Sequence, residues 1–305
     1  MKTAARVIIL GLSVIAFVVC APLCADPKAE AVMEQQRAYF ARINAVELRA
    51  TSTETFNQAL EAANGGGPTY PVVKHELALD GARYLCKLSY CKKEGDKPEK
   101  TNTYAYDGTR YQQLEGNKTI WVQRASPWPN LYRVWTLVTA PFGFAFDKQD
   151  VIAFSALKNP GKWSALLPEV ISVEDQVNML GHKGCRVKFK KPQNGKYLAT
   201  YTVFFAEDLD YFPIHTRIDY LEPKDDAPRA ELTVTQTVRT PEGIVFPAAV
   251  QIVDYYKADT RQAVTTITLD TDSLKINRAI PGERFTIPKT EGVRVYDADL
   301  KTMLD

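Results

Sequence analysis

The clearest pattern in the chain is the alternation of apolar and polar residues between Cys185 and Asp297. A period of two residues is typical of antiparallel strands that turn one face to a core and the other to water. The pattern therefore predicts a long antiparallel sheet in the second half of the chain. Its strands are expected at Cys185–Lys190, Tyr197–Phe205, His215–Leu221, Leu232–Thr240, Ala248–Lys257, Ala263–Ile276 and in a tail that ends at Tyr296–Asp297.

The first half of the chain predicts one helix followed by further strands. Asp26 and Pro27 suit the N-cap and the first position of a helix, which we expect to end near Arg42. Its mostly apolar stripe consists of Val32, Gln36, Tyr39, Phe40 and Ile43. The strands expected after it are Ala45–Thr55, Tyr70–Asp80, Arg83–Cys91, Thr101–Tyr106, Arg110–Leu114 and Thr119–Arg124.

The alternation stops in the middle of the chain, where Pro127 and Pro129 interrupt the sheet. The following segment, Leu131–Phe146, is almost continuously apolar and aromatic. Two short helices are then expected at Asp150–Leu157 and Lys162–Leu167. We expect this block to lie across the open side of the sheet as a helical lid.

Together these elements predict one α+β domain over residues 26–305. Its strongly curved, mostly antiparallel sheet is expected to form an incomplete, or half, β-barrel. The helix at Pro27–Arg42 and the lid at Asp150–Leu167 are expected to close the concave side. Burial of apolar surface is worth about 25 cal/mol per Å², so such a face must be covered by the chain's own helices, by an acyl chain or by another protein.

The first 25 residues have the composition of an export signal. Lys2 and Arg6 precede the apolar segment Val7–Val19, and Leu23-Cys24-Ala25 offers a cleavage site after Ala25. An uncleaved membrane anchor is the alternative, but this apolar segment is short for a bilayer span. We therefore expect a periplasmic protein whose signal peptide, residues 1–25, is removed.

The charge balance limits the possible binding partners, and the cysteine positions limit the possible disulfide bonds. Removal of residues 1–25 takes two of the 38 basic residues and no acidic one, which leaves 36 of each sign. A balanced chain lacks the basic stripe of a nucleic-acid-binding protein. Of the three remaining cysteines, Cys86 and Cys91 would lie too far apart on one strand for a disulfide. Either Cys185 pairs with one of them, or all three are free.

No catalytic or metal-binding motif is present, so we expect no enzyme, no catalytic residue, no metal site and no cofactor. The chain has three histidines, and the strand pattern places His75 on the same face as Val73 and Leu77. A hydrogen-bonded histidine in the core is one interpretation of His75. The other is a hydrolase in which His75 acts with a nearby carboxylate.

Aromatic side chains recur at strand positions. They can pack across strands, as aromatics do in many sheets, or they can line a cavity that receives an apolar ligand. The lid-like block favours the cavity. The candidate lipid-cavity residues are Val73, Leu77, Leu79, Tyr84, Leu88, Tyr104, Tyr106, Trp135, Phe142, Phe144, Phe146, Tyr201, Val203, Phe205, Tyr220 and Val234.

Several short motifs accompany this order of elements. They are the aromatic hairpin Tyr104–Tyr111, the turn Leu180–Val187, the junction Asp208–Arg217, the closing strand Ile276–Phe285 and the tail Glu291–Asp297. Together with the order of the elements, these motifs resemble the periplasmic lipoprotein-carrier superfamily of LolA/LolB-like outer-membrane lipoprotein-sorting proteins. The resemblance implies a half-barrel that carries lipid or lipoprotein acyl chains, in a divergent branch of the superfamily.

Besides the hydrolase, two functions from different classes are consistent with the sequence. The first is a periplasmic carrier, a monomer that holds the acyl chains of a lipid or lipoprotein in an apolar cavity. The second is an envelope sensing, regulatory or structural module of the same fold that docks a partner protein and transports nothing.

Overall fold

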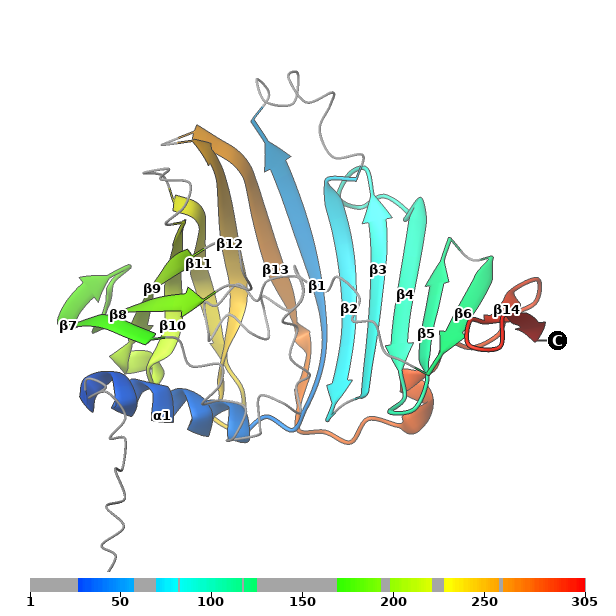
Figure 1. Cartoon of the computed structure of the whole chain (residues 1–305), viewed down its shortest axis with the longest axis horizontal. Helices are drawn as coiled ribbons and strands as arrows, with labels where there is room; N and C mark the ends of the chain where they lie inside the picture. The colour runs from blue at the N-terminus through cyan, green and yellow to red at the C-terminus, as the bar shows by residue number, and fades with distance from the viewer. Residues whose placement is uncertain are drawn as a thin grey trace, which may run out of the picture.

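The computed structural model describes residues 27–57, 70–81, 83–116, 118–124, 169–192, 198–220, 228–257 and 260–304. These residues form the helix α1 (Pro27–Ala41), two short 3₁₀ helices and one 15-stranded sheet, as Figure 1 shows. The strands are β1 (Ala45–Phe56), β2 (Val72–Asp80), β3 (Arg83–Cys91), β4 (Lys100–Tyr106), β5 (Tyr111–Glu115), β6 (Thr119–Gln123), β7 (Glu169–Met179), β8 (His182–Pro192), β9 (Leu198–Ala206), β10 (Phe212–Tyr220), β11 (Pro228–Arg239), β12 (Val245–Lys257), β13 (Thr260–Ile276), β14 (Arg294–Asp297) and β15 (Thr302–Leu304). The 3₁₀ helices are η2 (Glu207–Leu209) and η3 (Gly282–Phe285).

The strand order across the sheet is β15-β14-β6-β5-β4-β3-β2-β1-β13-β12-β11-β10-β9-β8-β7. Strands β1 to β6 form one run of antiparallel neighbours, and β7 to β13 form a second run. The two runs meet where β1 pairs with β13. Strand β14 then returns to the far edge and pairs in parallel with β6.

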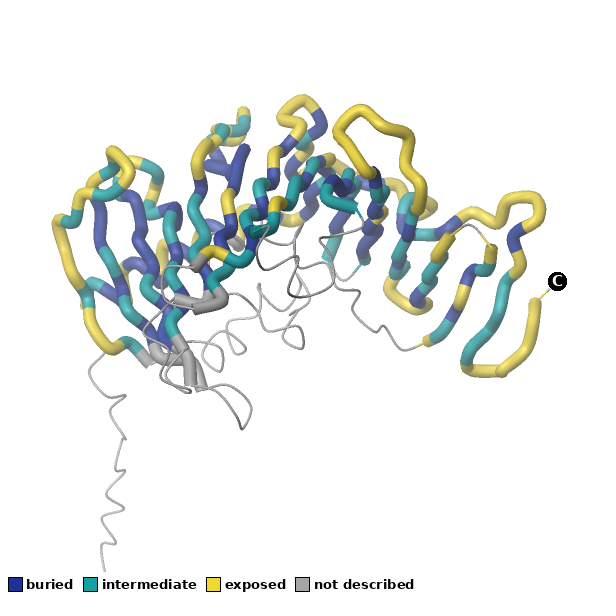
Figure 2. The backbone as a smooth tube through the Cα atoms, turned by 90° about the horizontal axis from the view of Figure 1, so that it is seen from above, coloured by how far each residue is buried: buried dark blue, intermediate teal, exposed yellow. Residues whose placement is uncertain are grey.

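The sheet is bent along its length, and Figure 2 shows it as an arch with buried positions alternating along the strands. On the concave face lies the larger core cluster, which includes Val46, Leu48 and Leu77. On the outer, convex face lies a second cluster, which includes Ala78 and Leu85. Both faces of the middle strands are therefore covered, unlike a simple sheet with one face in water.

Helix α1 packs against the concave face at the end formed by β7 to β12 (Figure 1), and its Lys28 pairs with Asp175 of β7 at 3.3 Å. Tyr39 donates a hydrogen bond from its hydroxyl to the carbonyl oxygen of Val245 at 2.8 Å, and its ring meets Phe212 edge to face. The expected buried stripe is confirmed for Val32, Gln36, Tyr39 and Ile43. The side chain of Phe40 lies outside the described residues, as does Asp26.

The expected curved, mostly antiparallel half-barrel is confirmed, but its expected closure is not. Helix α1 covers one end of the concave face, and the described strands form an open sheet with two edges, at β7 and β15. The expected lid at Asp150–Leu167 lies outside the described residues, so no helical lid is supported. Residues 1–25, the expected export signal, also lie outside the described part.

The outer face is covered by the segment that follows β13. Phe285 is fully buried there with Ile280, Ile287 and Val293. They pack against β2, β3, β4 and β6, where alanine occupies positions such as Ala78. The small side chains on these strands leave room for the larger side chains of the segment, so the segment and the convex face of the sheet pack closely. This second core was not expected from the sequence.

Most expected strands are found within a few residues of their expected bounds, but β7 and β15 were missed. In β7 the register with β8 shifts twice, between Val170 and Ser172 and between Glu174 and Val177. Each β-bulge adds a residue to one strand and so shifts the alternation of faces. Strand β15 has only three residues, and all three are exposed, so no alternation marks it.

At Gly184 the backbone of β8 lies close to the backbone of β9. A substitution at this position therefore tests the fold. A Cβ at this position would lie 1.9 Å from the carbonyl oxygen of Phe205 on β9. We expect Gly184→Ala to lower the free energy of unfolding by about 1–3 kcal/mol, as overpacking does in cores. Urea unfolding followed by circular dichroism would measure the loss.

Gly282→Ala is the matched control for this substitution. A Cβ at Gly282 would meet its nearest atom at 3.9 Å, the tip of the flexible Arg83 side chain. We expect this variant to unfold at nearly the same urea concentration as the wild type. Equal midpoints for both variants would contradict the close β8–β9 approach.

Candidate functional site

The candidate site is the concave face of the sheet, where most of the expected cavity residues come together. Nine of them are buried members of the concave core, and two tyrosines are partly buried against it. The nine are Val73, Leu77, Leu79, Tyr84, Leu88, Tyr201, Val203, Phe205 and Val234, and the two are Tyr104 and Tyr106. Trp135, Phe142, Phe144, Phe146 and the side chain of Tyr220 lie outside the described residues. The lining of a cavity by these side chains stays a prediction.

One row of directly paired residues crosses the concave face from β1 to β15. The three residues at its β1 end, from β1 to β3, are fully buried. At its other end Trp121 is 50% exposed and Met303 is 46% exposed. The concave face therefore passes from a packed core to an accessible aromatic and apolar surface. The row runs Leu48, Leu77, Cys86, Tyr104, Gln113, Trp121, Tyr296, Met303.

In the second half of β1 and the first half of β2, polar groups interrupt the apolar surface. The hydroxyl of Ser52 and Nε2 of His75 form a hydrogen bond of 2.8 Å, and both residues are buried. This confirms the interpretation of His75 as a hydrogen-bonded core histidine. Its partner in this bond is a hydroxyl group, whereas the hydrolase hypothesis requires a carboxylate.

A second polar network continues across β4 and β5 on the same face. Tyr104 donates a hydrogen bond from its hydroxyl to Glu115 at 3.1 Å, and Gln113 donates to the same carboxylate oxygen at 2.8 Å. Tyr111 donates to the amide oxygen of Gln113 at 2.9 Å. Burial raises the pKa of Tyr104 and of Tyr111, and the charge of Glu115 adds to both shifts. Both phenols therefore remain protonated donors at neutral pH.

Asn102 begins this network and has one unsatisfied atom. Its amide nitrogen donates to the hydroxyl of Tyr104 at 3.2 Å. Its amide oxygen is buried and accepts no hydrogen bond, although the residue is only 4% exposed. A buried acceptor without a donor costs free energy, because it has lost its hydrogen bond to water.

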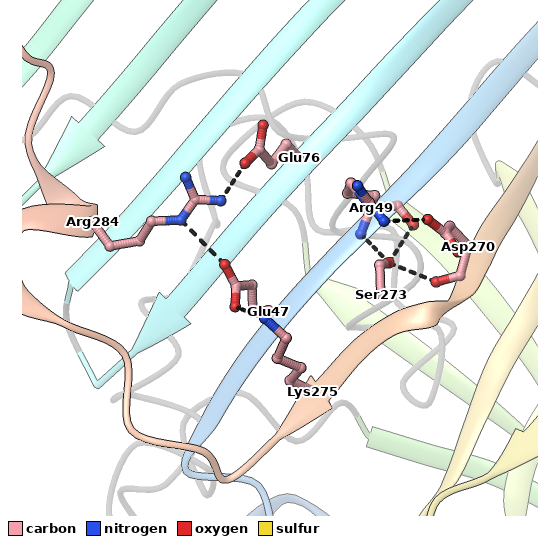
Figure 3. Close-up of polar contacts among 7 residues, drawn as sticks. All are labelled: Glu47, Arg49, Glu76, Asp270, Ser273, Lys275 and Arg284. Atoms are coloured by element: carbon pink, nitrogen blue, oxygen red, sulfur yellow. Dashed lines mark hydrogen bonds and ion pairs between the residues drawn. The ribbon is translucent and has the colours of Figure 1, made fainter.

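The convex face opposite the site carries a group of ion pairs that Figure 3 shows. Arg284, in η3, binds the carboxylates of Glu47 at 3.2 Å and of Glu76. Lys275, on β13, binds the other oxygen of Glu47 at 2.9 Å. The ion pairs therefore attach the segment that follows β13 to β1 and β2.

A bulge where β1 pairs with β13 lies beside these ion pairs. The register shifts between Glu47, which faces Lys275, and Arg49, which faces Asp270. Ser273 satisfies the backbone there, since its hydroxyl accepts from the amide of Arg49 at 2.8 Å and donates to the carbonyl oxygen of Asp270 at 2.6 Å. The Arg49 guanidinium also pairs with the Asp270 carboxylate at 2.9 Å.

The three described cysteines, Cys86, Cys91 and Cys185, are buried and free. The possible bridge from Cys185 is therefore not formed. Burial raises the pKa of the Cys185 thiol to about 11, so it is protonated at neutral pH. Burial also raises the pKa of the Cys86 thiol.

Within the described ranges, no three His, Cys, Asp or Glu side chains are grouped so that they could hold a metal ion. None of the described helices has both the length and the apolar character needed to cross a membrane.

Comparison with known proteins gives matches to solved structures alone. No family model and no curated protein sequence matches the chain. A DUF1329 family protein from Desulfovibrio piger ATCC 29098 is 11% identical over 86% of this chain and 98% of that chain, with a TM-score of 0.48. A putative outer membrane lipoprotein-sorting protein domain from Vibrio parahaemolyticus is 9% identical over 84% of this chain and 94% of that chain, with a TM-score of 0.46.

A third solved structure, LprF from Mycobacterium bovis, is 11% identical over 84% of this chain and 97% of that chain, with a TM-score of 0.30.

Because the amide oxygen of Asn102 is buried and unsatisfied, we expect that its removal stabilises the fold. Leucine has nearly the shape of asparagine and buries no polar atom, so we expect Asn102→Leu to raise the free energy of unfolding by about 1 kcal/mol. Thermal unfolding would measure the change. Asn178→Leu, at an exposed position of β7, is the control and should leave the midpoint within experimental error. A destabilised Asn102→Leu protein would show that the hydrogen bond from Asn102 to Tyr104 contributes more than removal of the unsatisfied oxygen gains.

The ion pairs of Glu47 should make the stability of the fold depend on pH in the acidic range. Its burial would raise the pKa of this carboxyl, but the hydrogen bond and charge of Lys275 and the charge of Arg284 outweigh burial and lower the pKa. The ion pairs therefore stabilise the fold above the ordinary pKa of a glutamate, and the stabilisation is lost as the pH falls through the lowered value.

We expect the unfolding midpoint of the wild type to fall more steeply than that of Glu47→Gln as the pH falls below the ordinary pKa of a glutamate. Denaturant titrations at a series of pH values would measure both slopes. Glu94→Gln, in an exposed loop, should keep the slope of the wild type. Parallel curves for the wild type and Glu47→Gln would contradict the role of this carboxylate.

Proposed function

We propose that this protein is a periplasmic binding protein, not an enzyme, whose concave face takes the acyl chains of a lipid or lipoprotein. The observation that carries the proposal is the long apolar concave face, of which α1 covers one end. An acyl chain gains about 0.8 kcal/mol for each CH₂ removed from water. A carrier can use this gain to move such chains through an aqueous compartment.

The arrangement of polar groups supports an amphipathic ligand. Ligand sites are mostly apolar and have a few polar groups that fix the orientation of the ligand. The concave face has this composition, because the pair Ser52–His75 and the network around Asn102 lie beside its apolar surface. Acyl chains would lie on the apolar part, with the polar end of the ligand toward these groups. The export signal expected at residues 1–25 supports the periplasmic location.

A second candidate function is an envelope module that docks a partner protein. Six large hydrophobic side chains among the described residues are exposed, and four of them lie at one end of the sheet. Trp121 and Met303 lie on the same face of that end, and exposed apolar side chains that lie together are typical of interaction sites. The four are Trp121, Leu300, Met303 and Leu304.

A binding assay with one variant on each face tests the first function. Native mass spectrometry of protein extracted from cells should detect co-purified lipid, and delipidated protein should take up a fluorescent fatty acid. Tyr106→Glu places a charge on the concave face, and we expect it to weaken uptake by about tenfold or more, since acyl chains do not solvate a buried charge.

Thr103→Glu is the matched control, because Thr103 lies on the same strand and its side chain points to the convex face. It should bind as the wild type does, and circular dichroism should show both variants folded. No co-purified lipid and no uptake by the wild type would overturn the carrier function. Capture of a defined envelope protein that is lost in Trp121→Ala would then favour the second function.

A further inference from the structure

The convex face has a hollow of about 340 Å³, separate from the concave site, above strands β13, β1, β2 and β3. Five charged side chains line it: Arg49, Lys74, Glu76, Lys87 and Asp270. The hydroxyl-bearing residues Thr51 and Ser89 also line it. The acyl-chain function proposed for the concave face makes no use of these groups.

The strand register arranges the lining in two neighbouring rows. One row alternates in sign across four strands, from Asp270 through Arg49 and Glu76 to Lys87. The next row places Lys74 between two hydroxyl-bearing residues, Thr51 and Ser89. Lys74 and Lys87 are diagonal neighbours on adjacent strands, close enough for long side chains to reach a common ligand.

The carboxylates of the hollow already have cationic partners. Asp270 pairs with Arg49 at 2.9 Å, and Glu76 pairs with Arg284, which also binds Glu47. Glu47 has a second partner in Lys275. In this group of ion pairs, each carboxylate is therefore balanced by a guanidinium or ammonium group.

Two cationic side chains that line the hollow, Lys74 and Lys87, are not paired with a carboxylate of the described residues. The Nζ atom of Lys74 donates to the carbonyl oxygen of Asp96 at 3.3 Å, which is a neutral partner. Neither Lys74 nor Lys87 forms an ion pair with any residue in the described ranges. The hollow therefore has a local excess of positive charge, although the chain as a whole is nearly neutral.

We propose that this hollow binds a phosphate group. Lys74 and Lys87 supply two ammonium donors and opposing charge, and Thr51 and Ser89 supply neutral hydroxyl donors for the remaining oxygens. Hydrogen bonds from charged donors to an oxyanion are stronger than neutral ones, and a lysine ammonium binds phosphate as a point charge. A hollow of 340 Å³ also has room for a group attached to the phosphate. The phosphate can come from a free phosphate ester or from a phospholipid headgroup.

Isothermal titration of the full-length mature protein with inorganic phosphate and with glycerol 3-phosphate, at low ionic strength, tests the site. We expect saturable binding by the wild type and a loss of affinity of about tenfold or more in the double variant Lys74→Ala/Lys87→Ala. The control is Lys93→Ala/Lys97→Ala, which removes the same charge from the exposed loop beside the hollow and should bind as the wild type does.

Co-sedimentation with vesicles distinguishes the two sources of phosphate. Association with phosphatidylglycerol vesicles that is lost in Lys74→Ala/Lys87→Ala and kept in the control identifies a lipid headgroup. Binding of the soluble phosphates without vesicle association identifies a free ester. The proposal is overturned if neither probe binds, or if the double variant and the control bind equally. Acyl-chain uptake by the concave face should be unchanged in the double variant, so this outcome is independent of the carrier function.

Discussion

The structure depends on the pairing of β1 with β13. This antiparallel pair joins the run β2–β6 to the run β7–β12, which makes one continuous sheet from segments more than two hundred residues apart in the chain. The pair is irregular at the bulge between Glu47 and Arg49, where Ser273 satisfies the backbone and Lys275 and Asp270 bind the charges of β1. Non-local pairing of this kind closes a long loop and therefore costs chain entropy, which the contacts along the pair must offset.

The two faces of the joined sheet have different roles in packing. The concave face contains the larger core and receives α1, and the convex face is covered by a later part of the chain that contains η3. Exposed polar and charged residues remain where neither cover reaches, as at the hollow beside Arg49. The candidate acyl-chain site and the candidate phosphate site are thus surfaces of one sheet that lie on opposite sides of the same strands.

Local patterns in the sequence predict much of this fold. Alternation placed Val73, His75 and Leu77 on one face, and the structure buries all three there. Turn residues such as Gly81 and Gly108, both with positive φ, separated the expected strands. Such features depend on neighbouring residues, so one sequence is enough to find them.

The remaining features depend on residues far apart in the chain. The strand order, the parallel return of β14 to β6 and the contact of Arg284 with Glu76 bring together residues that no local spacing relates. The convex core was missed because the alanines that make room for Phe285 carry no signal of their own. For the candidate site, sequence selected residues that the structure places together on the concave face. It did not select the network of Asn102, since amides and tyrosines at strand positions are common in any sheet.

The segment between β13 and β14 has a mechanical consequence. It crosses the convex face from the ion pairs of Arg284 to the pairing of β14 with β6. Greater bending of the arch would lengthen the path along its convex side, and flattening would shorten it. Either change would have to shift the packing of Phe285 and the ion pairs of Arg284, so this segment stiffens the strands that it covers against bending.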